Sequence, residues 1–486
     1  MKILIAASEV VPFAKTGGLA DVSGALPKAL EAMGHEVRVI MPKYKCVDEE
    51  KFGLKPSRLS PLFFNVPIGG KIQTAILKSS STGKNIPVYF VENDKYFNRD
   101  GLYGDAKADY PDNGERFSFF CRAVLEGLKT VFFKPDVIHC NDWQTGLVPV
   151  YIKTLYRNDP QMRNVRTLYT IHNLAYQGLF ACQILDFAGL DRALFNYHQL
   201  EFYGKVNFAK AGLVFSDVLN TVSEKYAQEI QTSKFGCGLD GVLLERVKDL
   251  YGIINGIDYE EWNPSTDKYI LEKYDNETLE GKNVNKQNLQ RVFGLPNMDV
   301  PLIGLIGRLA AQKGLDILES ALPSLIKQDV QFVLLGKGDE KYEVLCQELS
   351  VKYPEKFKVQ LGFDVPLSHQ IYAGCDLFIM PSYFEPCGLG QLIALRYGTI
   401  PVVHATGGLA DTISDYNEIT EEGQGFSFEE YSSTQLILTL ERAISIYQNR
   451  QRWIRLMKNV MNLRFSWQNS AKKYLKLYEK ICNSGL

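Results

Sequence analysis

Short apolar runs alternate with amphipathic segments along almost the whole chain, and this alternation restricts the possible folds more than any other feature. In the first half, the apolar runs lie at 2–7, 36–41, 136–140, 167–172 and 214–223. The spacing of Leu26, Leu30 and Met33 predicts a helix over 23–33, which Gly34 ends. Strands that alternate with helices favour a parallel, doubly wound sheet. The sequence therefore predicts an α/β fold.

The second half of the chain repeats this pattern. Its apolar runs lie at 301–309, 330–336, 358–362, 376–382 and 400–403, and an amphipathic segment covers 315–326. Two such runs of about 200 residues each predict two domains with a cleft between them. We expect the polar stretch 265–290, rich in Asn and Lys, to be a surface excursion. A final apolar helical face on 466–481 needs a packing partner.

Charge and cysteine usage exclude several classes of protein. The 486 residues carry 54 Lys and Arg against 56 Asp and Glu, a net charge of −2, which argues against a nucleic-acid partner. Nine scattered cysteines without a CxxC pair favour reduced thiols. The start, MKILIAASEV, lacks the long apolar core of a signal peptide, and no apolar run has membrane-spanning length. We expect a soluble cytoplasmic protein with no membrane partner.

Several familiar catalytic motifs are missing from the sequence. It contains no GxxxxGKS or GxxxxGKT, no GxSxG and no HExxH. The six histidines lack metal-ligand spacing, and no two aspartates are separated by a single residue. We therefore expect chemistry that uses neither a metal nor another cofactor.

Paired glycines mark two loops of the same composition. The segment TGGLAD occurs at 16–21, directly after Lys15, and again at 406–411. Paired glycines let a backbone approach a ligand closely, and a helix that starts there offers N–H groups to an anion. A purely structural turn explains either pair alone equally well.

Charged residues and histidines follow several of the predicted strands. Arg308 and Lys313 follow one strand closely enough to bind a diphosphate together, although two solvated cations would give the same pattern. Glu385 precedes a predicted helix at 392–397, where it could cap the helix or face a reacting sugar. Asp142 and His172 follow two strands of the first half, and a buried core histidine is the simpler interpretation of His172.

Taken together, these segments resemble the bacterial glycogen synthase and plant starch synthase family. The segments are SEVVPFAKTGGLADV at 8–22, NDWQTGL at 141–147, TIHNLAYQG at 170–178, INGIDYEEWNP at 254–264, GRLAAQKGLD at 307–316, MPSYFEPCGLGQL at 380–392 and RYGTIPVVHATGGLADT at 396–412. They span nearly the whole chain, and their combination is highly specific.

The resemblance implies a GT-B fold with two Rossmann-like domains facing a central cleft. The first domain is expected at 1–249, with 466–486 packing back on it, and the nucleotide-sugar-binding domain at 250–465. The implied reaction is transfer of glucose from ADP-glucose, or from UDP-glucose, to the non-reducing 4-OH of an α-1,4-glucan such as glycogen. The configuration of the anomeric carbon would be retained.

The resemblance also carries roles onto matching residues. Lys15, Arg308 and Lys313 match positions that meet the donor phosphates, and Glu385 and His172 match positions beside the glucose. The implied catalytic residues are Glu385, His172, Arg308 and Lys313. The implied substrate-binding residues are Lys15, Gly18, Asp21, Asp142, Asn173, Asn255, Tyr103, Cys387, Gly388, Leu389, Gly390, Thr406 and Gly407. Among these, Asp142 and Tyr103 match acceptor-side positions, and Asn255 matches a position near the donor.

The sequence departs from the family pattern at several of these places. Gly390 stands where Thr or an apolar residue is usual, and Asn141 replaces a usual His. Arginines common at positions 383, 404 and 405 are replaced by Tyr383, His404 and Ala405. These losses of positive charge bear on donor preference.

Three other functions compete with this interpretation. A degradative phosphorylase would need a pyridoxal phosphate lysine and a much longer chain. A glucan-binding protein without activity is disfavoured by the presence of Lys15, Arg308, Lys313 and Glu385 together. A transferase that acts on small sugar acceptors stays open.

Overall fold

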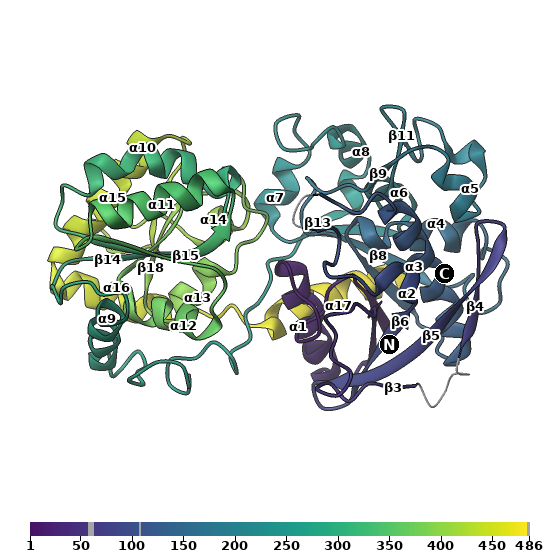
Figure 1. Cartoon of the computed structure of the whole chain (residues 1–486), viewed down its shortest axis with the longest axis horizontal. Coiled ribbons are helices and arrows are strands. Elements are labelled where there is room, and N and C mark those ends of the chain that lie inside the picture. The colour runs from purple at the N-terminus through teal and green to yellow at the C-terminus, as the bar shows by residue number, and fades with distance from the viewer. Residues whose placement is uncertain (57–62, 106–107, 484–486) are drawn as a thin grey trace. The chain divides into compact units, whose positions relative to one another are not determined.

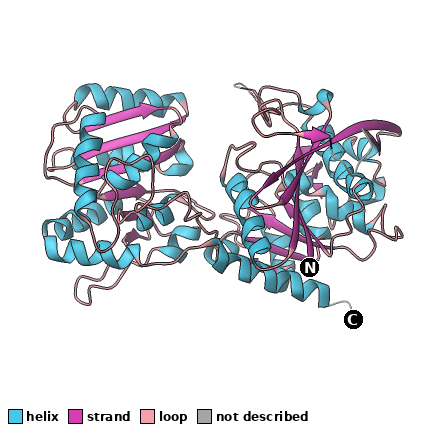
Figure 2. Cartoon of the chain, turned by 90° about the horizontal axis from the view of Figure 1, so that it is seen from below, coloured by secondary structure: helices cyan, strands magenta, loops and turns pink. Residues whose placement is uncertain are grey.

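The computed structural model describes residues 1–56, 63–105 and 108–483. The chain forms two compact units. Unit 1 consists of Met1–Val222, Ala227–Ile253 and Trp467–Leu486, and unit 2 consists of Ser223–Tyr226 and Ile254–Ser466. Figure 1 shows the elements of both, and Figure 2 shows helices on the two faces of each sheet.

Unit 1 is built on one large sheet. Its strand order is β13-β12-β8-β7-β1-β2-β6-β5-β3, with β4 paired to β5. The strands are β1 (Lys2–Ala6), β2 (Glu36–Pro42), β3 (Lys55–Pro56), β4 (Phe64–Ile68), β5 (Lys71–Thr82), β6 (Ile86–Glu92), β7 (Val137–Asn141), β8 (Arg166–Ile171), β12 (Val218–Thr221) and β13 (Leu250–Gly252). The strands from β13 to β6 pair in parallel, and β3, β4 and β5 form an antiparallel edge.

Helices cover both faces of this sheet. They are α1 (Gly18–Ala32), α2 (Asp94–Phe97), α3 (Asn113–Thr130), α4 (Leu147–Lys153), α5 (Ile184–Ala188), α6 (Phe208–Phe215), α8 (Asp240–Glu245) and α17 (Trp467–Asn483). A separate small sheet has the order β10 (Glu201–Phe202), β11 (Lys205–Asn207) and β9 (Leu179–Phe180). All residues of β7 are buried, as expected for a parallel strand covered on both sides, and its two polar residues, His139 and Asn141, are hydrogen bonded.

The C-terminal helix α17 packs against α1 and β8 in unit 1 (Figure 1). Its apolar face, with Ala471, Tyr474 and Tyr478, is fully buried. Tyr478 donates to Nδ1 of His139 on β7 at 2.8 Å, and the Nε2 of His139 lies 2.5 Å from the Thr170 hydroxyl. Thr170 in turn donates to Asn220, so His139 is the donor to Thr170 and its Nδ1 is an acceptor. A buried polar chain thus ties the last helix to three adjacent strands.

Unit 2 contains a parallel sheet of strand order β16-β15-β14-β17-β18-β19. The strands are β14 (Leu302–Leu309), β15 (Gln331–Gly338), β16 (Phe357–Leu361), β17 (Leu377–Met380), β18 (Ile400–His404) and β19 (Phe426–Phe428). The helices are α7 (Glu224–Glu229), which spans the boundary between the units, α9 (Glu280–Val292), α10 (Leu315–Leu325), α11 (Glu340–Lys352), α12 (Val365–Gly374), α13 (Gly390–Arg396), α14 (Gly407–Thr412), α15 (Ser433–Gln448) and α16 (Arg450–Met461). Figure 1 shows α10, α11 and α15 on one face of the sheet, with α9, α12 and α13 on the other.

Three sequence-based expectations differ from the structure. The helix expected at 23–33 begins at Gly18, because its first turn contains the second glycine of the loop. The strand expected at 214–223 is the end of α6 followed by β12, since an apolar run does not distinguish a buried helix end from a strand. The stretch 265–290 is only partly a surface excursion: residues 265–279 form turns that are mostly exposed, but the last part lies in α9, where Lys282 and Lys286 are buried.

These buried lysines of α9 explain why the polarity of the segment was misleading. Lys282 donates to the Tyr397 carbonyl at 3.0 Å and to the Thr399 hydroxyl at 2.7 Å, and burial lowers its pKa to about 8. Lys286 pairs with Asp376 at 2.7 Å. The polar face of α9 therefore binds the ends of strands instead of water.

No helix in the described part of the chain combines the length and apolar character that crossing a bilayer requires. Within residues 1–56, 63–105 and 108–483, no group of three or more His, Cys, Asp or Glu side chains is arranged to hold a metal ion.

The polar chain under α17 predicts a measurable stability effect. In Tyr478→Phe the buried Nδ1 of His139 loses its donor, so we expect the free energy of unfolding to fall by about 1–3 kcal/mol. Urea denaturation followed by circular dichroism measures this difference. Tyr203→Phe, at a phenol that is 84% exposed, is the matched control and should leave the midpoint unchanged. Equal midpoints for the two variants would contradict the proposed role of this chain.

Candidate active site

Parallel pairing brings three candidate loops of unit 1 to the same edge of its sheet. β1 pairs with β7, and β7 pairs with β8, so Ala6, Cys140 and Tyr169 lie side by side near the strand ends. The segment after β1 leads to the first glycine loop, the segment after β7 contains Asp142, and the segment after β8 contains His172. In open α/β sheets, ligands bind beyond the carboxyl ends of the strands.

The first glycine loop lies exposed at the start of α1. Cβ atoms built on Gly17 and Gly18 would meet nothing within 4 Å, so their surroundings are open. Lys15 forms an ion pair with Asp21 at 2.7 Å, and burial raises the pKa of Asp21 while Lys15 opposes that rise. The N–H groups of Thr16 and Gly17 donate to the Glu9 carboxylate. Two of the backbone N–H groups that were expected to bind an anion are therefore already hydrogen bonded to Glu9.

Asp142 lies directly after β7 with its backbone in the left-handed region, at φ 55°. Its Oδ1 accepts the N–H of His172 at 2.7 Å. Burial raises the pKa of Asp142 to about 7, although the N–H groups of His172 and Asn173 lower it and the charge of Glu9 raises it. The strained backbone and the shifted pKa mark this carboxyl group as a functional candidate.

His172 is a buried neutral imidazole. Burial lowers its pKa to about 3. Its Nε2 lies 2.9 Å from Oδ1 of Asn141, whose amide nitrogen donates to the Ala6 and His139 carbonyls. The Asn141 oxygen must therefore accept, which places the proton of His172 on Nε2 and a lone pair on Nδ1. This histidine can accept a hydrogen bond from a hydroxyl group but is not an acid near neutral pH.

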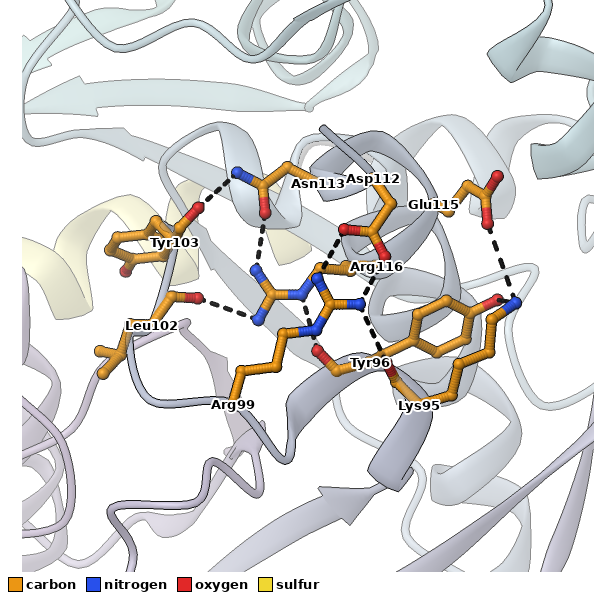
Figure 3. Close-up of polar contacts among 9 residues, drawn as sticks. All are labelled: Lys95, Tyr96, Arg99, Leu102, Tyr103, Asp112, Asn113, Glu115 and Arg116. Atoms are coloured by element: carbon orange, nitrogen blue, oxygen red, sulfur yellow. Dashed lines mark hydrogen bonds and ion pairs between the residues drawn. The ribbon is translucent and has the colours of Figure 1, made fainter. Parts of the chain in front are cut away.

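Tyr103 belongs to the loop after α2, and its hydroxyl lies 2.6 Å from Glu9 and 2.7 Å from Ser8. Burial, together with the charge of Glu9, raises the pKa of Tyr103 well above its usual value, so the phenol donates to Glu9. Figure 3 shows how the main chain of this loop is held by Asn113, which donates to the Tyr103 carbonyl at 2.8 Å, and by Arg116, which donates to the Leu102 carbonyl at 3.0 Å.

In unit 2, two adjacent strand ends bring the candidate phosphate and sugar groups together. Lys313 follows β14 and donates to Oε2 of Glu385 at 2.6 Å, and Ser382 donates to the same oxygen at 3.0 Å. Arg308 is exposed near the end of β14, where it donates to Gln312 at 3.1 Å. Glu385 is 6% exposed, so one buried carboxylate fixes the lysine beside it.

The segment from Cys387 to Gly390 leads into α13. Burial raises the pKa of Cys387 to about 12, which keeps the thiol protonated, and the backbone N–H of Asn255 faces its sulfur. Gly388 has φ 73°, and Leu389 is the N-cap. A Cβ on Gly390 would lie 2.9 Å from the Phe378 ring, which explains why this chain has no side chain there.

The second glycine loop has different surroundings from the first. A Cβ on Gly407 would lie 2.0 Å from the Glu385 carbonyl, and one on Gly408 would lie 2.0 Å from the Cys387 carbonyl. Gly408 also donates to the Glu385 carbonyl at 3.1 Å. These glycines are therefore required by contact with backbone beside Glu385, and Thr406 before them is buried.

Aromatic side chains occupy two of the positions where arginines were expected. His404, at the end of β18, contacts the Ser382 carbonyl at 2.7 Å and the Glu429 carbonyl at 3.2 Å. The rings of Tyr383 and His404 each pack against Tyr431. The polar ring of His404 thus holds the segment that contains Ser382, next to Glu385.

Sequence reasoning missed three residues of these networks. Glu9 was part of the first quoted segment, yet nothing in its spacing shows that it contacts both the glycine loop and Tyr103. Asn141 was noted only as a departure, and Ser382 was not singled out. Their roles depend on contacts between distant parts of the chain, for which the local sequence gives no signal.

Comparison with protein families matches both halves of the chain. The model described as "starch synthase catalytic domain" matches residues 2–245, and the model described as "glycosyl transferases group 1" matches residues 286–460. The chain is 50% identical to the glycogen synthase of Geotalea daltonii over 482 residues, which cover 99% of each chain. It is 49% identical to that of Moorella thermoacetica over 483 residues, which cover 99% of this chain and 96% of the relative.

Comparison with solved structures confirms the expected GT-B class of fold. The catalytic domain of starch synthase IV from Arabidopsis thaliana, bound to ADP and acarbose, matches with a TM-score of 0.91 and 36% identity over 99% of each chain. The sucrose-phosphate synthase of Thermosynechococcus elongatus, at 16% identity and a TM-score of 0.61 over the whole of each chain, shares the fold. Given these matches and the family segments at both sheet edges, the chain belongs to the glycogen and starch synthase family of glycosyltransferases.

Proposed function

We propose that this glycosyltransferase moves glucose from ADP-glucose to the non-reducing 4-OH of an α-1,4-glucan, with retention at the anomeric carbon. The observation that supports it most is the arrangement of Arg308, Lys313 and Glu385 at two neighbouring strand ends. Two cations there suit a leaving diphosphate, and the carboxylate suits a sugar beside it. The starch synthase structure bound to ADP supports an adenine nucleotide as the donor.

In this proposal, Arg308 and Lys313 stabilise the diphosphate as the bond to the anomeric carbon breaks. The acceptor hydroxyl attacks from the same face, and the leaving phosphate oxygen takes its proton. Glu385 stays bound to Lys313 and Ser382, so it acts as an electrostatic and sugar-binding group and not as a nucleophile. Lys15 is assigned a further phosphate contact, with Gly18 and Asp21 in the same loop.

The remaining residues are assigned to sugar and acceptor contacts. The lone pair on Nδ1 of His172 is suited to accept a hydrogen bond from a glucose hydroxyl, next to Asn173. Asp142 and Tyr103 are assigned to the acceptor. In unit 2, we assign the donor contacts to Asn255, to Thr406 and Gly407, and to the segment 387–390. The segments 387–390 and 406–407 would contact the donor through their backbone.

Measurement of donor and acceptor preference tests this function directly. We expect ADP release from ADP-glucose and glycogen to be faster than UDP release from UDP-glucose. The new linkage should be removed by an enzyme specific for α-1,4 bonds, which verifies retention. Faster turnover with UDP-glucose would contradict the donor assignment. Transfer to free glucose but not to glycogen would instead favour a transferase that acts on small sugar acceptors.

Lys313→Ala tests the role of the cation beside Glu385. Loss of one charge-stabilising group in a dry site should lower kcat roughly 10²–10³-fold. Steady-state assays of nucleotide release measure this. Lys458→Ala removes another lysine of unit 2, which pairs with Glu277 at 3.6 Å, and should keep parental turnover. Near-normal kcat in Lys313→Ala would exclude the assigned role.

The raised pKa of Asp142 predicts a pH dependence. If the ionised carboxylate accepts a hydrogen bond from the glucan, kcat/KM for the glucan should rise as the pH passes upward through about 7, where Asp142 loses its proton. Asp142→Asn should remove this inflection because the amide does not titrate. An unchanged profile in the variant would assign the inflection to another group.

A further inference from the structure

Glu9 is a buried carboxylate at the centre of the candidate groups of unit 1. It lies in the loop after β1 and is 4% exposed. It accepts hydrogen bonds from the Thr16 N–H, the Thr16 hydroxyl at 2.6 Å, the Gly17 N–H at 3.2 Å and the Tyr103 hydroxyl at 2.6 Å. These donors are neutral groups, and burial of a carboxylate among neutral donors is costly unless each hydrogen bond is well made.

The contacts of Glu9 join two separate segments of the chain. Oε2 holds the backbone between Lys15 and Gly18, which fixes the start of α1. Oε1 holds the hydroxyl of Tyr103, 94 positions later in the sequence. One side chain therefore fixes both the loop assigned to the donor phosphate and the tyrosine assigned to the acceptor.

Several hydrogen bonds hold the main chain at the tyrosine end of this connection (Figure 3). Arg116, which is fully buried, donates to the carbonyls of Tyr96 at 2.7 Å and Leu102 at 3.0 Å, and to the Asn113 side chain at 2.6 Å. Asn113 donates to the Tyr103 carbonyl. Because the main chain of Tyr103 is held in this way, its hydroxyl has a defined position from which to fix Glu9.

The charge of Glu9 also reaches the titratable candidates around it. It contributes to the raised pKa of Asp21, of Asp142 and of Tyr103. Asp21 also faces the cation of Lys15, whereas Asp142 faces the N–H groups of His172 and Asn173. A change at Glu9 should therefore be detected at both the phosphate side and the acceptor side.

We propose that Glu9 is a positioning residue that holds the Lys15 loop and Tyr103 in one fixed arrangement, so that the donor-side and acceptor-side contacts of unit 1 form together. This inference rests on the proposed function for the roles of Lys15 and Tyr103. Glu9 itself needs no contact with either substrate.

Kinetic comparison of Glu9→Gln and Tyr103→Phe tests the coupling. Glu9→Gln removes the charge and one acceptor oxygen, so we expect KM to rise for both donor and glucan and kcat to fall about 10-fold to 100-fold. Tyr103→Phe should raise KM for the glucan more than KM for the donor. If the Tyr103 hydroxyl acts through Glu9, the fold loss of kcat/KM for the glucan in the double variant should be smaller than the product of the losses in the two single variants.

The pH dependence of kcat/KM for the glucan distinguishes a positioning role from a loss of stability, because a loss of stability alone would not change the pH of its inflection. In Glu9→Gln the negative neighbour of Asp142 is gone, so the inflection of kcat/KM for the glucan should shift to lower pH. The matched control is Glu126→Gln, which alters another carboxylate of unit 1 that accepts a tyrosine hydroxyl, that of Tyr156 at 2.5 Å. The control should keep both KM values and the position of the inflection.

Hydrogen exchange measured by mass spectrometry tests the positioning without any activity. In Glu9→Gln, peptides that cover 15–21 and 101–105 should both exchange faster than in the parent, and Glu126→Gln should change neither. Unchanged exchange in either segment, or parental KM values for both substrates, would overturn the inference. Faster exchange in both segments of a chain whose parent transfers no glucose would retain the positioning role and reject the proposed function.

Discussion

Parallel strand pairing determines where the loops that carry most of the candidate side chains lie. In unit 1 the in-register pairs between β1, β7 and β8 place the first glycine loop, Asp142 and His172 beyond the same sheet edge. In unit 2 the pairing of β14 with β17, and of β17 with β18, does the same for Lys313, Glu385 and the second glycine loop. Since neighbouring strands lie about 5 Å apart, loops that are distant in sequence supply side chains that can hydrogen bond.

The repeated segment TGGLAD shows that one sequence can serve two structural purposes. At 16–21 the glycines face open space and the preceding lysine pairs with Asp21. At 406–411 both glycines press against the carbonyls of Glu385 and Cys387, and Asp411 accepts hydrogen bonds from Ser223 and the Lys225 backbone. Glycine is needed in the second loop by backbone packing, whereas in the first loop only access to a ligand would require it.

The sequence predicts those features that are local and periodic. The apolar runs located most of the parallel strands, and the family segments located the residues at their ends. The prediction was wrong where polarity and burial diverge, as in α9, whose lysines are satisfied by the Tyr397 carbonyl, the Thr399 hydroxyl and the Asp376 carboxylate. It was silent on Glu9, because a carboxylate that joins Thr16 to Tyr103 is recognisable only once the fold has brought residues 94 positions apart into contact.

Both lysines assigned to phosphate are paired with a carboxylate of their own unit, Lys15 with Asp21 and Lys313 with Glu385. Such a pair immobilises a long side chain in advance, at a site where an unpaired lysine would lose about 2 kcal/mol of rotamer freedom on binding. The carboxylate also weakens the attraction to an incoming anion, and the attraction that is left is larger for a diphosphate than for a neutral sugar because it grows with the charge of the ligand. At Glu385, one carboxylate oxygen accepts hydrogen bonds from both Lys313 and Ser382, so the carboxylate that holds the lysine is itself held in place. In the proposed function, how each lysine is held therefore matters for binding the phosphates as well as the positive charge that it carries.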